Sequence, residues 1–320
     1  MHRTAFSPLP DQPFISVCIP TYRRAELLPR LLDSLCVQTF RDFEVVVTDN
    51  TEAGNDEVER MALSYRDRLP LTYYRNPPGL TMGENWNRCF SLAKGEWLKM
   101  IHDDDWLCKP DSLEQFARAA RESGALFLFS SYYLTDPDKG AQKLMFPPAD
   151  ALRRLRKEVL YLAKSNIIGP PSVTMIHRSA VLPYKALKWM VDVEGYIRML
   201  QQGKGSFHWI EEPLMCILEH SGQATHAYFR NPEVEIPENL EILTSHEPEI
   251  LDYYWSYDHF WRLLRNTGIR DEAALRRLAQ GQAIPRQWLR MLRVQKRLPH
   301  RLLQSGVFSK IAMTISYLTR

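Results

Sequence analysis

The chain has 320 residues, of which 45% are hydrophobic and 25% charged, and its formal net charge is +3. These values suit one large folded domain or two fused halves, and 8 Trp, 14 Tyr and 13 Phe argue against a disordered protein. No apolar run reaches the 18 or so residues that a membrane-spanning helix needs, and the N-terminus lacks the apolar core of a secretory signal. Five scattered cysteines without a CxxC spacing indicate reduced thiols, so we expect a cytoplasmic protein.

The first 135 residues alternate between strand-like and helix-like patterns. Thr81 and Glu84 form a capping box that predicts a helix to Lys94, ended by Gly95. Such alternation predicts an α/β fold with a mostly parallel sheet and helices on both faces. The expected strands are 14–20, 43–50, 71–74, 96–101 and 125–133, and the expected helices are 24–36, 56–65, 81–94 and 111–122.

The second part of the chain is less regular. A loop or hairpin over 136–148 precedes a basic helix, 149–164, and a Gly-Pro-Pro loop, 166–172, leads into a strand. A helix over 190–202, two short strands within 207–220 and aromatic-rich helices over 237–267 follow. We expect a nucleotide-binding half, 1–135, an acceptor and catalytic half, 136–232, and a helical extension, 233–320.

Polar residues follow the first, second and fourth expected strands. They are Thr21 to Arg23, Asp49 with Asn50, and Asp103 to Asp105. Ligands of parallel sheets bind at the carboxyl ends of the strands, so these residues should converge at one edge. Adjacent carboxylates favour a hard divalent cation, Mg²⁺ or Mn²⁺, shared with a diphosphate. The alternative is a solvated acidic turn or a helix cap.

Four segments together resemble family 2 glycosyltransferases of the GT-A fold, of the bacterial polysaccharide and lipopolysaccharide type. They are ISVCIPTYRR, SLCVQTFRDFEVVVTDN, GENWNRCFSLAKGEWLKMIHDDDW and VDVEGYIRML, in the order and spacing of the family, within residues 14–221. The chain departs from the family pattern at Arg23, where Asn is usual, and at His102, where the first Asp of the acidic motif is expected.

The resemblance implies a nucleotide-sugar site with a bound metal. The residues implied for the nucleotide sugar are Pro20, Thr21, Tyr22, Arg23, Asp49, Asp103 and Asp104, and those for the metal are Asp104, Asp105 and His220. Asn87 lies in a helix beside this expected pocket and is a further candidate donor contact. The loop Gly169 to Ser172 is either a wall of the sugar pocket or an ordinary rigid turn.

The resemblance also implies a catalytic base. Inverting members carry an Asp six residues before an Arg, which matches Asp192 and Arg198. On a helix, Glu194 and Arg198 are four residues apart and should pair, whereas Asp192 faces another side near the helix N-terminus. Asp192 is therefore the candidate for deprotonating an acceptor hydroxyl, and the alternative is a plain helix cap.

The C-terminal region is basic. Ten Lys and Arg and no acidic residue follow Glu272. Arg286, Arg290, Arg293 and Arg297 share one helical face opposite apolar residues, and a second apolar stripe follows Gly306. Such a tail either lies on an anionic membrane surface, at the inner face of the cell membrane, or packs on the protein with a solvated basic face. No nucleic-acid-binding motif accompanies the charge.

The predicted function is transfer of a sugar from a nucleotide-diphosphate sugar to a hydroxyl of a glycan or lipid-linked acceptor, with inversion and a divalent metal. Two alternatives remain. One is a nucleotidyltransferase, which the absence of Gly from Thr21 to Arg24 disfavours. The other is an inactive nucleotide-sugar-binding module held at the membrane.

Overall fold

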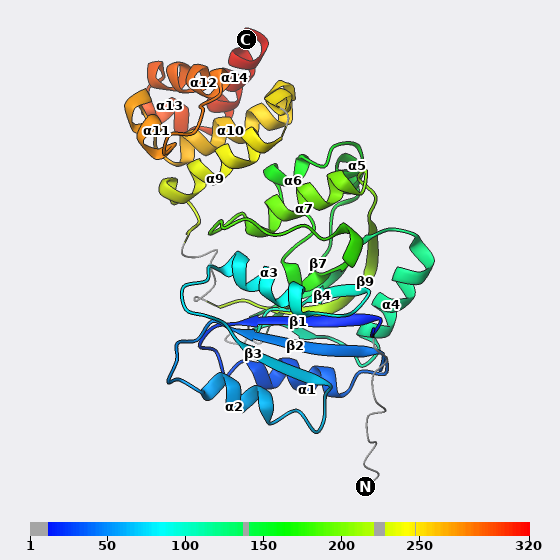
Figure 1. Cartoon of the computed structure of the whole chain (residues 1–320). Helices are drawn as coiled ribbons and strands as arrows, with labels where there is room; N and C mark the ends of the chain where they lie inside the picture. Colours follow the sequence, from blue (N-terminus) through cyan, green and yellow to red (C-terminus); the bar gives the residue numbers. More distant parts are fainter. Residues whose placement is uncertain (1–11, 137–140, 221–227, 247) are drawn as a thin grey trace. The chain divides into compact units, whose positions relative to one another are not determined.

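The computed structural model describes residues 12–136, 141–220, 228–246 and 248–320 (Figure 1). The chain forms two compact units. The first comprises Met1–Val159, Asn166–Ala186 and Val191–Ser221, and the second comprises Leu160–Ser165, Leu187–Met190 and Gly222–Arg320. The three-part division expected from the sequence stays a prediction.

The first unit is built on a nine-stranded sheet in the order β3-β2-β1-β4-β8-β6-β9-β5, with β7 paired to β6. The four strands from β3 to β4 are parallel, as expected, whereas β4–β8, β8–β6 and β9–β5 are antiparallel and β6–β9 is parallel. The α/β class is confirmed, and the sheet beyond β4 is mixed. The strands are β1 (Ile15–Thr21), β2 (Phe43–Asp49), β3 (Leu71–Arg75), β4 (Trp97–Met100), β5 (Trp106–Leu107), β6 (Phe127–Asp136), β7 (Ala141–Met145), β8 (Thr174–His177) and β9 (His208–Leu218).

Helices cover both faces of this sheet (Figure 1), with α1 and α2 on one side and α3 on the other. Every residue of β1 and β2 is buried, which explains their continuous apolar runs. α1 begins at Leu28 rather than Arg24 because residues 24–27 form a turn, closed by a bond from Leu27 N to Arg24 O. The helices of this unit are α1 (Leu28–Cys36), α2 (Glu57–Leu63), α3 (Met82–Leu92), α4 (Ser112–Ser123), α5 (Ala149–Lys157) and α7 (Val191–Gln202).

The capping box of α3 is confirmed: Thr81 N donates to Glu84 Oε2 at 2.7 Å, and Glu84 N donates to Thr81 Oγ1 at 3.3 Å. The helix ends at Leu92, before Gly95. Gly95 instead packs against β1, where its N–H donates to Ser16 Oγ at 2.7 Å. A Cβ at this position would lie 2.5 Å from Ser16 N, so only glycine fits.

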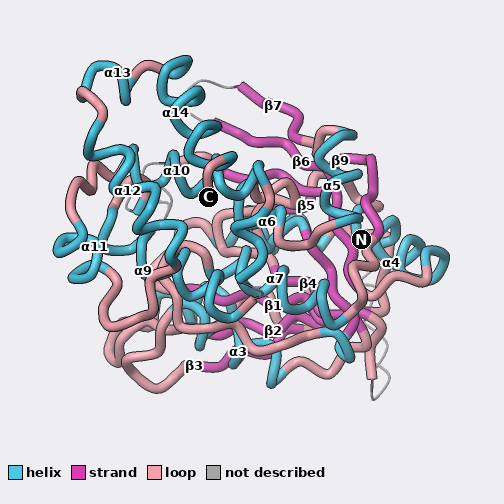
Figure 2. The backbone as a smooth tube through the Cα atoms, turned by 90° about the horizontal axis from the view of Figure 1, so that it is seen from above, coloured by secondary structure: helices cyan, strands magenta, loops and turns pink. Residues whose placement is uncertain are grey.

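Two expectations for the second part need correction, and a third, the hairpin, is confirmed. β7 (Ala141–Met145) runs antiparallel beside β6 (Figure 2). The basic helix is two helices, α5 and α6 (Tyr161–Lys164), because Glu158 is extended. The two strands expected within 207–220 are one strand, β9, with a bulge opposite Ser130 and Ser131. The register shifts lie on both sides of Pro213, which has no N–H to continue the ladder.

The second unit is helical and packs around Trp261 and Trp288, both almost fully buried. Trp261 Nε1 donates to Ser309 Oγ at 3.0 Å, and the hydroxyls of Tyr257 and Ser316 are 2.7 Å apart. Among the described residues, no helix has the length and apolar character needed to cross a membrane. Besides α6, its helices are α9 (Pro232–Ser245), α10 (Tyr254–Asn266), α11 (Glu272–Leu278), α12 (Arg286–Arg297), α13 (His300–Gln304) and α14 (Gly306–Leu318).

Candidate active site

The polar ends of β1, β2 and the segment after β4 meet at one edge of the sheet. Thr21 and Asp49 are register partners on adjacent parallel strands. Ile101 N donates to Cys18 O, which continues the alignment of β4 with β1, and Thr21 Oγ1 donates to Asp103 Oδ2 at 2.7 Å. The structure therefore brings together the three segments that the sequence pattern singled out.

The three consecutive carboxylates are buried: Asp103 is 4% exposed, Asp104 9% and Asp105 2%. This burial rules out a solvated acidic turn. Asp103 and Asp104 share the guanidinium of Arg24, whose Nη1 lies 3.3 Å from Asp103 Oδ1 and 3.0 Å from Asp104 Oδ2. His220 Nε2 lies 2.9 Å from the same oxygen of Asp104.

Asp105 is held by a different set of donors. Ser172 Oγ donates to its Oδ2 at 2.5 Å, and Leu218 N donates to its Oδ1 at 3.2 Å. Ser172 Oγ also accepts from His102 N at 2.9 Å. The Gly-Pro-Pro-Ser loop is therefore a support for the acidic cluster.

Burial makes negative charge costly in this cluster. Burial, and then the neighbouring Asp104, raise the pKa of Asp103 to about 6, although Arg24 and Thr21 act in the opposite direction. The same two causes, in the same order, raise the pKa of Asp105 well above its usual range. A bound cation would relieve this strain, because it stabilises adjacent ionised carboxylates.

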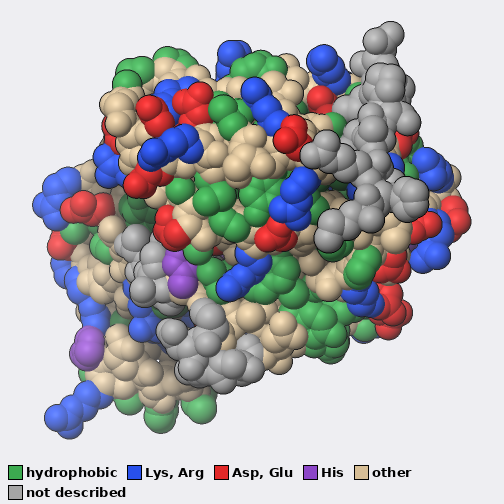
Figure 3. Space-filling model, turned by 90° about the horizontal axis from the view of Figure 1, so that it is seen from below, with side chains coloured by type: hydrophobic (Ala, Val, Ile, Leu, Met, Phe, Trp, Pro, Cys, Tyr) green, Lys and Arg blue, Asp and Glu red, His purple; other side chains and the backbone are tan. Residues whose placement is uncertain are grey.

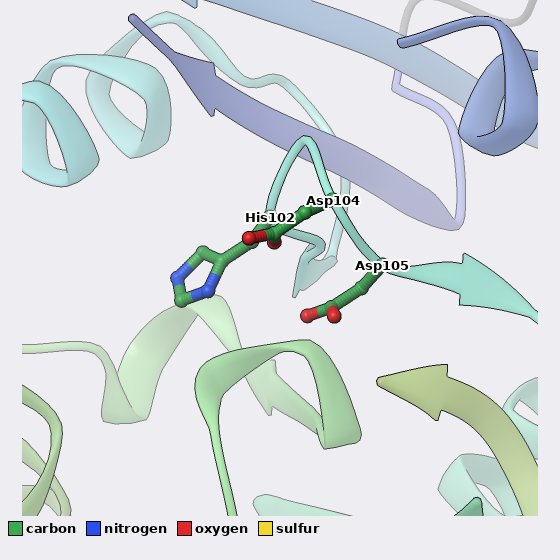
Figure 4. A group of neighbouring side chains, drawn as sticks. All are labelled: His102, Asp104 and Asp105. Atoms are coloured by element: carbon green, nitrogen blue, oxygen red, sulfur yellow. The ribbon is translucent and has the colours of Figure 1, made fainter. Parts of the chain in front are cut away.

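A potential metal-binding group lies on the loop that follows β4 (Figure 4). His102, Asp104 and Asp105 each offer one ligand atom, and these atoms lie within 4.8 Å of one another. Burial lowers the pKa of His102, which keeps the imidazole neutral as metal ligation requires. The expected residues Asp104 and Asp105 are in this group, whereas His220 contacts the group through Asp104.

Lys99 is a further buried charge behind this loop. Its side chain is fully buried on β4, and its ammonium donates to Ser172 O and, at 3.4 Å, to Met100 O. Burial lowers the pKa of Lys99 to about 7, with Asp105 acting in the opposite direction. Lys99 thus binds the main chain of Ser172, and the hydroxyl of Ser172 in turn binds Asp105.

At the end of β2, Asp49 is fully buried and accepts hydrogen bonds from Thr51 N and Tyr73 Oη, both at 2.8 Å. These two bonds fix the orientation of its carboxylate. Pro20 lies in β1 opposite Thr48.

The expected nucleotide contacts Tyr22 and Arg23 both turn towards Glu52. Tyr22 Oη donates to Glu52 Oε1 at 2.9 Å, and Arg23 Nε donates to Oε2 at 2.7 Å. The Arg23 hydrogen bond lowers the pKa of Glu52 to about 2. Arg23 itself has a φ of 60°, in the left-handed region that Asn, the usual family residue, tolerates better.

Both polar atoms of the Asn87 side chain bind the main chain of another segment. Its Nδ2 donates to Tyr184 O at 2.8 Å and its Oδ1 accepts from Tyr184 N at 2.7 Å. The side-chain amide thus binds the main chain of Tyr184, and its contact with the sugar donor stays a prediction.

Asp192 lies in the first turn of α7. Its Oδ2 accepts from Asn166 Nδ2 at 2.9 Å and its Oδ1 accepts from Val193 N at 2.8 Å. Asn166 also donates to Gly169 O at 3.1 Å. One short loop, 166–172, therefore contacts Asp192 at its start and Asp105 at its end.

The ion pair expected beside Asp192 is present. Arg198 binds Glu194 through two bonds, of 2.7 and 2.8 Å, and Lys185 Nζ lies 3.1 Å from Glu194 Oε1. Because Glu194 is fully buried, this pair supports the helix from within and is not a surface pair.

Four residues of this site were not expected from the sequence: Arg24, Lys99, Asn166 and Ser172. Arg24 and Ser172 did stand in segments that the sequence marked, the polar turn after the first strand and the Gly-Pro-Pro-Ser loop. Asn166 is the first residue of the expected loop 166–172. No local pattern predicts the contacts of Asn166 or Lys99, because their partners lie far along the chain.

The solved structures similar to this chain show its fold. The S. aureus TarS 1-349 structure in complex with UDP-GlcNAc is 17% identical with a TM-score of 0.58, covering 95% of this chain and 89% of that one. The mannosyltransferase PcManGT from Pyrobaculum calidifontis, in complex with GDP-Man and Mn²⁺, is 16% identical with a TM-score of 0.53, covering 99% and 90%.

Sequence comparison places the chain in a family. An uncharacterized protein of Mycobacterium tuberculosis is 30% identical over an alignment of 207 positions, and the match covers 60% of this chain and 63% of that protein. The putative colanic acid biosynthesis glycosyl transferase WcaA of Escherichia coli is 26% identical over 196 residues, 59% of this chain and 67% of WcaA. The family model for glycosyl transferase family 2 matches residues 16–183, more than half of the chain. The protein therefore belongs to glycosyl transferase family 2.

Proposed function

We propose that the protein transfers a sugar from a nucleoside-diphosphate-sugar donor to a hydroxyl group of an acceptor, with inversion at the anomeric carbon. The observation that carries this proposal is the buried row Asp103 to Asp105 at the end of β4, joined through Thr21 and Arg24 to the turn after β1. In an open α/β sheet this edge is where a nucleotide binds.

The residues present fit a divalent cation. The donor atoms of His102, Asp104 and Asp105 are close together, and the pKa values of Asp103 and Asp105 are raised by burial and by Asp104. Carboxylate oxygens with one imidazole nitrogen suit Mn²⁺, and carboxylates alone suit Mg²⁺. We assign the ion to Asp104 and Asp105, with His102 as the nearest further ligand and His220 bound to Asp104. When bound, the cation supplies positive charge for the departing diphosphate.

The donor is held by the neighbouring strand ends. Thr21, Tyr22 and Asp49 lie at the ends of β1 and β2, where the nucleoside is proposed to bind. Arg24 adds a permanent charge beside Asp103 and Asp104 and is well placed to bind phosphate oxygens, for which a guanidinium has the matching geometry.

Asp192 is proposed as the general base. Asn166 and Val193 N each bond one of its oxygens, which orients the carboxylate, and an ionised carboxylate can accept the proton of an acceptor hydroxyl. A single displacement of the diphosphate by that hydroxyl inverts the anomeric centre.

The acceptor is proposed to be a glycan or a lipid-linked sugar, used by an enzyme at the inner face of the membrane. The name of WcaA, from colanic acid biosynthesis, supports a polysaccharide acceptor. No observation favours a nucleotidyltransferase. An inactive binding module would keep donor binding and lack transfer.

The experiment that tests the site measures binding of a panel of nucleotide sugars, with and without Mn²⁺ or Mg²⁺. A bound donor increases the free energy of unfolding by mass action, by about 2.7 kcal/mol at a hundredfold excess over Kd, and therefore raises the melting temperature. We expect Asp104→Asn and Asp105→Asn to abolish the metal-dependent part of this increase. Asp33→Asn, an exposed aspartate of α1 paired with Arg68, is the control. A parental protein whose donor binding is unchanged by either metal would overturn the proposed site.

A further inference from the structure

A cationic pocket of about 590 Å³ lies on the second unit, between α12, the segment before α10 and the end of the chain. Five arginines and one carboxylate line it: Arg286, Arg290, Arg293, Arg297, Arg320 and Asp252. Four of the arginines come from successive turns of α12. Its opposite face, with Trp288 and Met291, is buried in the unit and fixes the arginines outward.

The arginines of α12 are not neutralised. Within the described part of the chain, Arg286 and Arg297 make no ion pair or side-chain hydrogen bond, and Arg293 bonds only Leu289 O at 3.3 Å. The one acid of the pocket, Asp252, lies 3.6 Å from Arg320 Nε. The pocket therefore carries an excess of positive charge that Asp252 balances only in part, and such an excess attracts an anion.

Arg290 gives the pocket a rigid wall. One Nη donates to Thr319 O and, at 2.8 Å, to Thr319 Oγ1, which joins α12 to the end of α14. Its Nε is buried and has no hydrogen-bond partner among the described residues. A buried N–H of a cation without an acceptor is costly, and an anionic oxygen would satisfy it.

An apolar stripe begins where this wall ends. Leu318, next to Thr319, is 73% exposed, and the stripe runs from there along α14. The stripe consists of Val307, Phe308, Ile311, Ile315 and Leu318, each more than half exposed. The other face of α14 is packed, through Ser309, Met313 and Ser316. A continuous exposed apolar face of this kind marks an interaction surface.

We propose that the arginine pocket binds the phosphate group of an anionic membrane lipid while the apolar stripe of α14 enters the acyl-chain region. Guanidinium groups bind phosphate oxygens in pairs, and a helix with an apolar face beside a basic surface suits the membrane interface. The inference deepens the membrane contact included in the proposed function, on which it rests, and names its residues and ligand.

The stripe decides between a lipid and a soluble phosphate. A free phosphate or a glycan phosphate would use the arginines and leave five large apolar side chains in water. A phospholipid uses both features, and two signals together are what stable attachment to a bilayer requires.

The test is co-sedimentation of the full chain with vesicles of phosphatidylcholine, with and without phosphatidylglycerol, in the absence of any sugar donor. We expect binding only to the anionic vesicles. Arg286→Gln with Arg297→Gln should weaken binding about 30-fold, since each arginine near an anionic surface contributes roughly a factor of five. Ile311→Ser with Ile315→Ser should weaken it comparably.

The matched control removes the same charge elsewhere in the unit. Arg276→Gln with Arg277→Gln changes two arginines of α11, outside the pocket, and should bind nearly as the parent does. If this control lost as much vesicle binding as the pocket variant does, the effect would follow net charge alone. That result would overturn the proposed role of the pocket. A second contrary outcome is possible. If the serine variant of the stripe bound vesicles like the parent, and glycerol phosphate competed for the pocket, the pocket would bind a soluble phosphate. That result would overturn the proposal of a lipid ligand.

Failure of this inference is separable from failure of the enzyme assignment, because vesicle binding needs no donor and transfer can be measured on a soluble acceptor. A parental chain that ignores anionic vesicles but transfers sugar would overturn the inference alone.

Discussion

At the scale of single residues, the site depends on charges placed where water is absent. Lys99 is fully buried, its ammonium bonds Ser172 O, and the ring of Phe116 lies 4.8 Å from it. Asp103 to Asp105 are buried within the same region of the sheet edge. Buried charges stay in a fold only when paired or bonded, and each of these has at least one protein partner.

Lys99 should make stability depend on pH. Its pKa falls from the usual 10.5 to about 7 on folding, so the folded state releases a proton that the unfolded state keeps. Stability therefore rises as pH increases from about 7 towards 10.5, by an amount of a few kcal/mol. We expect urea unfolding between these pH values to show this rise for the parent and not for Lys99→Met. Lys143→Met, an exposed lysine of β7, should behave like the parent, and parallel curves for parent and Lys99→Met would contradict the prediction.

Asp192 should matter for transfer and not for donor binding. Asp192→Asn keeps the shape of the side chain but cannot take a proton, so we expect kcat to fall by about 10²- to 10⁴-fold. The donor Kd, measured by calorimetry with Mn²⁺ present, should change little. Asp150→Asn, an exposed aspartate of α5, serves as control. Transfer at the parental rate by Asp192→Asn would refute its role as base.

At the scale of elements, close packing between α3, β1 and β4 positions the site. The segment from α3 to β4 passes so near β1 that Gly95 N bonds Ser16 Oγ, and Arg178 returns to cap the same segment through Gly95 O at 2.8 Å. Since β1 is central in the parallel part of the sheet, a shift there would displace both strand ends of the site.

Gly95→Ala should therefore destabilise the protein. The new Cβ would lie 2.5 Å from Ser16 N and 2.9 Å from Ile15 C, both main-chain atoms that cannot turn away. Overpacking of this kind costs about 1–3 kcal/mol, which thermal unfolding can detect. Gly306→Ala at the start of α14 is the matched control, because nothing lies within 4 Å of its Cβ position and alanine favours a helix. An unchanged melting temperature for Gly95→Ala would contradict the prediction, because it would mean that β1 can shift without loss of unfolding free energy.

At the scale of the whole molecule, charge is divided unevenly. The face shown in Figure 3 mixes Lys and Arg with Asp and Glu, whereas every charged residue after Glu272 is basic. Mixed surfaces suit solvent, and a surface of one sign attracts a partner of the opposite sign over about one Debye length. The proposed attachment surface, made of the basic α12 face and the apolar stripe of α14, belongs to the second unit, and the proposed sugar-transfer site belongs to the first.

The two interpretations of the C-terminal tail were packing on the protein and contact with a membrane. The structure supports packing for α12, whose Trp288, Met291 and Leu292 are buried. It leaves the stripe of α14 exposed, although both helices have similar apolar periodicity. Periodicity shows that a helix has an apolar face, but not whether the fold supplies a partner for it.

The sequence alone determined the α/β class, the strands and helices of the first 135 residues except the two-residue strand β5, the cap at Thr81, and the polar residues at three strand ends, because burial, periodicity and capping are local properties. Only the tertiary structure decided that the sheet turns mixed after β4 and that β9 is one bulged strand, since strand pairing joins residues far apart in sequence. It also decided that Arg24, Lys99, Asn166 and Ser172 support the carboxylates. A buried charge must find partners wherever the fold brings donors near, and no local pattern records where that is.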